Sequence, residues 1–119
     1  MPHVRIATAG DLHADHRIAP RIDEAFAQVA HASDIVLLAG DLTAHGEPAE
    51  AEIVAAACGR LDVPVYTVLG NHDYHGDHVA EITRILEDAG VVVLERSWAV
   101  ASVNGASVGI AGTKGFVGG

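Results

Sequence analysis

The chain has 119 residues, of which 50% are hydrophobic and 19% are charged; this composition allows one folded domain and argues against disorder. The formal net charge of −9 argues against general binding to nucleic acids, and no apolar run approaches the ~18 residues of a membrane span. Because the sequence has one cysteine, Cys58, and no recognisable signal peptide, we expect no internal disulfide and a cytoplasmic location.

Three short apolar runs predict the strands of a buried sheet. They span residues 4–9, 34–39 and 63–69. A glycine directly follows each run, at Gly10, Gly40 and Gly70. Continuous apolar strands of this kind are typical of a sheet that is covered on both faces. Pro64 places the third run at a sheet edge or at the start of a strand.

A helical pattern follows each of these runs. Ile22, Phe26 and Val29 recur with helical spacing after Pro20, which suits the opening turn of a helix. Residues 48–58 are rich in alanine and glutamate, and residues 77–89 place their apolar side chains on one helical face.

Further strands are expected after the last helix. Residues 91–94 are apolar, and the runs 98–103 and 106–111 flank Asn104-Gly105, a dipeptide that is typical of a two-residue hairpin turn. We therefore predict an α/β fold with the order β-α-β-α-β-α-β, parallel strands and right-handed crossovers, followed by a β-hairpin. Trp98, at the start of the hairpin, is predicted to pack against the rest of the domain.

The loops after the three apolar runs contain a pattern of polar residues. They read Gly10-Asp11-Leu12-His13, Gly40-Asp41-Leu42-Thr43 and Gly70-Asn71-His72-Asp73. Because the carboxyl ends of parallel strands share one edge of a sheet, we expect these side chains to converge. A single Gly-Asp after a strand is usually a turn, but carboxylate, imidazole and amide donors together favour a divalent metal site. A carboxylate such as Asp41 could bridge two cations about 3.5–4 Å apart.

The combination of Asp11-x-His13, Gly40-Asp41 and Gly70-Asn71-His72-Asp73 resembles the calcineurin-like metallophosphoesterase superfamily. The motifs are similar to those of small bacterial phosphoesterases and cyclic-nucleotide phosphodiesterases. The resemblance implies the N-terminal half of a four-layer αββα sandwich. It also implies hydrolysis of phosphomonoesters or phosphodiesters by a dinuclear metal centre.

The resemblance also implies roles for the loop residues. Asp11 and His13 match ligands of the first metal, Asp41 matches the bridging carboxylate, and Asn71 matches a ligand of the second metal. The two divalent ions could be manganese, iron, zinc, nickel or cobalt, which all accept this mixed donor set.

The remaining two residues of the third loop match catalytic groups of the family. His72 matches the histidine that contacts the scissile phosphate and helps to protonate the leaving group. Asp73 matches an acidic residue that orients this histidine, a physically reasonable arrangement because a carboxylate partner selects the imidazole tautomer.

The sequence departs from the family pattern after Asn71. Family members have a later histidine and a Gly-His-x-His motif that supply further metal ligands, and neither has a match here. We therefore expect residues 1–119 to form a phosphoesterase domain that is truncated at its C-terminus, with poor metal affinity and activity. The sheet face intended for the missing half would then be exposed and could self-associate.

Other functions remain open at this point. The chain could be a catalytically incomplete metal-binding fragment or module. An aspartate-bearing signalling domain would need a lysine at a strand end, and Lys114 is the only lysine in the chain. The expected partner is a small-molecule phosphate ester, with no nucleic acid and no membrane.

Several histidines near the predicted site have no assigned role. His45 could touch substrate or could be an ordinary solvated loop residue, and His16 and His75 also lie in the site loops. His78 is predicted to open the last helix. Cys58 is interpreted as a small buried hydrophobic residue because its helix carries few basic neighbours.

Overall fold

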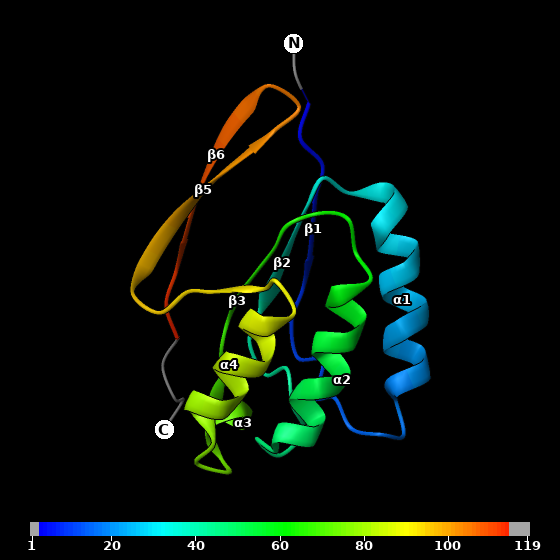
Figure 1. Ribbon diagram of the computed structural model, residues 1–119, viewed down its shortest axis with the longest axis vertical. Coiled ribbons are helices and arrows are strands. Elements are labelled where there is room, and N and C mark those ends of the chain that lie inside the picture. Colours follow the sequence, from blue (N-terminus) through cyan, green and yellow to red (C-terminus); the bar gives the residue numbers. More distant parts are fainter. Residues whose placement is uncertain (1–2, 115–119) are drawn as a thin grey trace.

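In the computed structural model, which describes residues 3–114, strands and helices alternate before a final hairpin (Figure 1). The elements are β1 (Ile6–Ala9), α1 (Ala19–Ala32), β2 (Ile35–Ala39), α2 (Pro48–Gly59), β3 (Val65–Val68), α3 (Asn71–Tyr74), α4 (Val79–Asp88), β4 (Val92–Val93), β5 (Ser97–Val103) and β6 (Ala106–Gly112). The predicted α/β order is therefore confirmed, with one additional short helix, α3, where a loop was expected.

The first four strands form one parallel sheet in the order β1-β2-β3-β4. Strands β5 and β6 form a separate antiparallel pair, in which Trp98 lies opposite Ala111. The turn between them has positive φ at both Asn104 (52°) and Gly105 (76°). This conformation suits a type I′ turn, so the predicted two-residue hairpin is confirmed.

Helices and hairpin cover opposite faces of the parallel sheet (Figure 1). Along β2, Val36 and Leu38 belong to the core beneath the helices, whereas Ile35 and Leu37 pack in the cluster that contains the hairpin. This alternation follows from the two-residue period of a strand. The resulting helix, sheet and hairpin layers agree with the expected half of a metallophosphoesterase fold.

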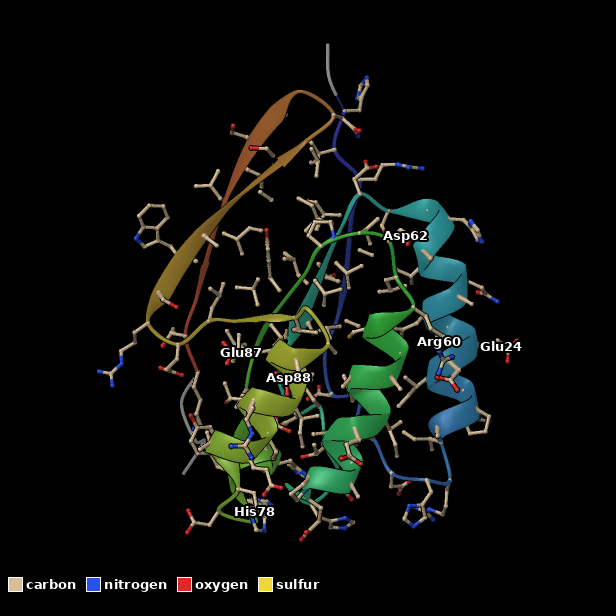
Figure 2. The ribbon with its side chains drawn as sticks, viewed as in Figure 1. Glu24, Arg60, Asp62, His78, Glu87 and Asp88 are labelled. Carbon is tan, nitrogen blue, oxygen red and sulfur yellow. The ribbon has the colours of Figure 1, made fainter. Side chains whose placement is uncertain are left out.

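Local sequence features explain where the helices begin and how they are joined. Pro20 lies in the first turn of α1, and α2 begins at Pro48 with a capping box between Glu47 and Glu50. At the other end of α2, Arg60 reaches α1 and forms an ion pair with Asp23 at 3.2 Å (Figure 2). Among residues 3–114, no helix combines the length and the apolar character needed to span a bilayer.

Two expectations about packing were wrong. Trp98 is 75% exposed, because the alternation of β5 turns Ala99 and Ala101 toward the sheet and leaves Trp98 and Val100 on the outer face. β1 is not buried on both faces either: it is an edge strand, and Ile6 is 46% exposed.

Two other expectations were correct. Pro64 immediately precedes β3, and its carbonyl accepts a hydrogen bond from Val36 N at 3.0 Å, as a residue at a strand start can. Cys58 is buried in the helix core, and burial raises the pKa of its thiol to about 12. This thiol is therefore protonated at neutral pH and is a poor nucleophile.

The edge strand is joined to β2 by an ion pair that should be visible in an acid titration. The Arg5 guanidinium donates to both oxygens of Asp34, at 3.3 and 3.2 Å, and Arg5 N donates to the same carboxylate at 2.8 Å. These bonds lower the pKa of Asp34 from 3.8 to about 2. The stabilisation is therefore complete above the ordinary pKa and is lost as the pH falls through about 2.

We expect carboxyl ¹³C NMR to show Asp34 still ionised at about pH 3, where an ordinary aspartic acid is largely protonated. Arg5→Gln should return the titration of Asp34 toward its ordinary range. An unchanged midpoint in this variant would show that Arg5 is not the cause.

Candidate metal centre

The three predicted loops meet at the carboxyl edge of the parallel sheet, at the lower end of the molecule in Figure 1. The first loop is hydrogen-bonded along the second: Asp11 N donates to Gly40 O at 3.2 Å, and His13 N donates to Asp41 O at 2.9 Å. These bonds extend the parallel pairing of β1 and β2 beyond the strands. They bring together residues of the two loops that are 28 or 29 positions apart in the sequence.

The loop backbones hold three of the predicted ligands in a rare conformation. Asp11, His13 and Asp41 have positive φ values of 55°, 46° and 50°. Aspartate and histidine are among the side chains that tolerate the left-handed region, but they enter it at some energetic cost. Such strain is common where a fold must direct side chains into a functional site.

One group of side chains has the geometry needed to hold a cation. His13, Asp41 and His72 each offer a ligand atom, and these atoms all lie within 4.8 Å of one another. The rings of His13 and His72 meet edge to face, with centroids 4.4 Å apart. Two imidazoles and a carboxylate form a donor set that suits borderline divalent metals.

The other two predicted metal ligands lie beside this group. The Asp11 carboxylate is 76% exposed, and its Oδ1 is 3.9 Å from His13 Nε2. Asn71 is half-buried and begins α3, directly before His72. The structure thus brings every predicted ligand to the same edge, with His13 and Asp41 in the closest group.

The orientation of His72 is set by a backbone carbonyl. Its Nδ1 lies 2.8 Å from Ala44 O, which can only accept, so Nδ1 carries a hydrogen. In the neutral ring, Nε2 then has a free lone pair. His72 N also donates to Asp41 Oδ1 at 2.9 Å, which ties the third loop to the second. The family resemblance implied that His72 contacts the substrate, whereas this geometry also suits a metal ligand.

The predicted contact between Asp73 and the His72 ring is replaced by a different set of hydrogen bonds. Asp73 is fully buried; its Oδ1 accepts from Thr43 N and Thr43 Oγ1 at 2.9 and 2.8 Å, and its Oδ2 accepts from Leu42 N and Gly70 N at 3.2 and 2.8 Å. The expected orienting role was therefore wrong in its detail. Asp73 instead connects the second and third loops beneath the donor group.

Two glycines allow these loops to approach closely. A Cβ atom at Gly70 would overlap the Asp41 carboxylate, so a larger residue there would displace the ligand. Gly46 has a φ of 72°, and a Cβ atom there would lie 2.8 Å from His72 O and 2.7 Å from Gly76 N. Both positions therefore require glycine for close backbone contact.

Two of the histidines around the donor group have defined positions in the structure. The His75 ring lies 4.9 Å from that of His72, between centroids, with a tilt of 30°. His78 is the N-cap of α4 at the lower end of the molecule (Figure 2), close to its predicted place at the start of the helix. The sequence did not predict that the Ala44 carbonyl orients His72, because every residue has a backbone carbonyl and no residue pattern shows which one faces a given side chain.

Comparison with known proteins agrees with this geometry. The sequence matches the family model described as calcineurin-like phosphoesterase over residues 4–113. No curated protein gives a significant match. The matched region includes the parallel sheet, its helices, the hairpin and all three loops of the candidate centre. The chain therefore belongs to the calcineurin-like phosphoesterase family.

Proposed function

We propose that this chain carries the first-half motifs of a metal-dependent phosphoesterase that hydrolyses phosphomonoesters or phosphodiesters. The observation that carries the proposal is the convergence of ligand atoms from His13, Asp41 and His72 within 4.8 Å of one another. These residues come from three separate loops, so their approach is a property of the tertiary fold. Family membership supports a hydrolase that acts on phosphate esters.

The donor set fits two divalent cations. Asp11, His13 and Asp41 would hold one ion, and Asp41 and Asn71 would contribute to a second. When bound, such cations neutralise phosphate oxygens and promote the ionisation of water. Manganese, iron, zinc, nickel and cobalt all suit a set of oxygen and imidazole donors that contains no thiolate.

His72 would act on the phosphate at the edge of this donor group. Its Nδ1–H is held by Ala44 O, which leaves Nε2 as the reactive nitrogen. A protonated Nε2 can donate to the leaving-group oxygen. Asp73, buried below, would support His72 by holding the third loop against the second.

The test combines metal binding with hydrolysis. We expect metal-free protein to bind manganese weakly in calorimetry and to hydrolyse a generic phosphodiester slowly, only when the metal is present. His72→Ala should lower the rate by about 100-fold or more and leave the metal content nearly unchanged, because a group that transfers protons contributes on this order. A fall in metal content in this variant would show that His72 is a ligand.

The main alternative is a metal-binding module without catalytic competence. Manganese binding with no hydrolysis at any metal concentration would favour this alternative, and no metal binding would contradict both. The four proposed ligands, Asp11, His13, Asp41 and Asn71, leave coordination positions for other donors. We propose that these come from residues outside the 119, as the family's later histidine motifs suggest.

The expected partner is a small-molecule phosphate ester. Self-association through the exposed apolar surface stays a prediction; it is supported by Trp98 and Val100, which are 75% and 53% exposed on the outer face of the hairpin. A cytoplasmic location also stays a prediction, based on the single cysteine.

A further inference from the structure

The His45 side chain is paired with the buried carboxylate of Glu50, and neither residue is a proposed metal ligand. Glu50 is only 7% exposed, and its Oε1 accepts hydrogen bonds from His45 N at 2.8 Å and Glu47 N at 3.2 Å. Its second oxygen, Oε2, lies 3.0 Å from His45 Nδ1. Burial alone would raise the pKa of Glu50, but the hydrogen bonds from His45 and Glu47 outweigh it, so the pKa lies below its ordinary value.

The ionised carboxylate fixes the orientation of the His45 ring. A carboxylate can only accept, so Nδ1 must donate, and Nε2 is the nitrogen left for another partner. The His45 side chain is 74% exposed, so Nε2 is accessible to a ligand. The capping box of α2 accounts for the bond from Glu47 N to Oε1, but it does not require the bond between Oε2 and the His45 ring.

The same loop lies against the candidate metal centre. Ala44, the neighbour of His45, accepts the hydrogen bond from His72 Nδ1 at 2.8 Å. On the other side of His45, the Gly46 backbone packs against the backbone of residues 72–76. The start of α2 and the short helix α3 lie at the same lower end of the sheet (Figure 1). The backbone on both sides of His45 therefore contacts the segment that carries His72.

We propose that His45 is a substrate-contacting residue whose Nε2–H, on a ring held by Glu50, donates a hydrogen bond to a phosphate oxygen of the substrate. Because Nδ1 donates to Glu50, the ring presents Nε2–H to the phosphate as an imidazolium, and such a charge-assisted bond to phosphate is stronger than a neutral one. This inference rests on the proposed function. It assigns to His45 a second protein contact to the phosphate, in addition to the contact proposed for His72.

The experiment follows the histidine rings by NMR in the full chain. Two-bond ¹H–¹⁵N spectra would be recorded for metal-free protein, after one equivalent of zinc per site, and during titration with dimethyl phosphate. We expect the His13 ring to respond to zinc, and the His45 ring to respond only to the phosphodiester. His45→Ala should weaken dimethyl phosphate binding by about tenfold, as expected for one charge-assisted hydrogen bond.

Two further variants separate this role from a structural one. Glu50→Gln keeps an oxygen for the backbone N–H groups and removes the charge beside the ring, so it should weaken phosphodiester binding by a similar factor with zinc binding unchanged. His31→Ala, which alters an exposed residue in the last turn of α1, should change neither affinity.

Other outcomes would overturn the proposal. If the NMR signals of the His45 ring shift when zinc alone is added, His45 is a metal ligand. If these signals do not change while the protein still binds dimethyl phosphate, His45 does not contact the phosphodiester. Unchanged affinity in His45→Ala would also contradict it. In each of these cases the proposed function survives. Failure of the protein to bind zinc would overturn both.

Discussion

Asp41→Asn should weaken manganese binding by about 100-fold or more, whereas Asp11→Asn should weaken it by about tenfold or less. Asp41 lies in the group of converging ligand atoms, and its Oδ1 already accepts the hydrogen bond from His72 N. As the proposed bridging ligand it would balance the charge of two cations. Asp11 would serve one ion, and its carboxylate is 76% exposed and well solvated.

Each substitution removes the negative charge of the side chain and keeps its size and shape. Asparagine matches aspartate in size and accepts the positive φ that both residues adopt, so the loops should keep their conformation. Calorimetric titration of metal-free variants with manganese measures the difference directly. Asp62→Asn is a suitable control, because Asp62 is exposed and lies before β3, at the opposite end of the parallel sheet from the metal centre (Figure 2). Equal losses in the two test variants would contradict the bridging role of Asp41.

Asp73→Asn should destabilise the metal-free protein by about 2–4 kcal/mol, because a buried acceptor of four hydrogen bonds is partly replaced by a donor. Each carboxylate oxygen faces two donor groups: Thr43 N and its hydroxyl on one side, and Leu42 N and Gly70 N on the other. Either orientation of the new amide therefore places NH₂ against a backbone N–H. The Thr43 hydroxyl can rotate, which reduces the penalty on its side.

Denaturant unfolding of the metal-free variants would measure this loss. Thr43→Val removes one of the four bonds to Asp73 and also the acceptor for Gly46 N, so it should cost about 1–2 kcal/mol. Asp77→Asn alters an exposed aspartate a few residues later and should cost little. If Asp73→Asn were as stable as the Asp77 variant, the buried carboxylate would not be the link between the loops.

Loss of this link should also reduce metal affinity. Asp73 does not contact the donor group directly, but it holds the backbone beside Asp41 against the start of α3, which carries His72. A ligand set that is not preorganised binds metal more weakly. Thr43→Ser, which keeps the hydroxyl, should restore the manganese affinity that Thr43→Val loses.

The order of the elements and the sheet edge that carries the polar loops can be read from the sequence. Apolar runs that end in glycine, separated by helical patterns, require parallel strands whose carboxyl ends meet at one edge. The Asn104-Gly105 turn is equally local, since both residues tolerate positive φ. The placement of Asp11, His13, Asp41 and Asn71 at one edge of the sheet follows from this topology, whereas the distances between their donor atoms do not.

Which atoms meet at that edge depends on contacts between loops that are far apart in the sequence. Asp73 binds the backbone of residues 42–43 and not the neighbouring His72 ring, and His72 is oriented by the Ala44 carbonyl. Backbone groups are present at every position, so no residue pattern shows which of them faces a given side chain. Exposure of Trp98 is decided in the same way, because its strand face depends on which side of the hairpin packs on the sheet.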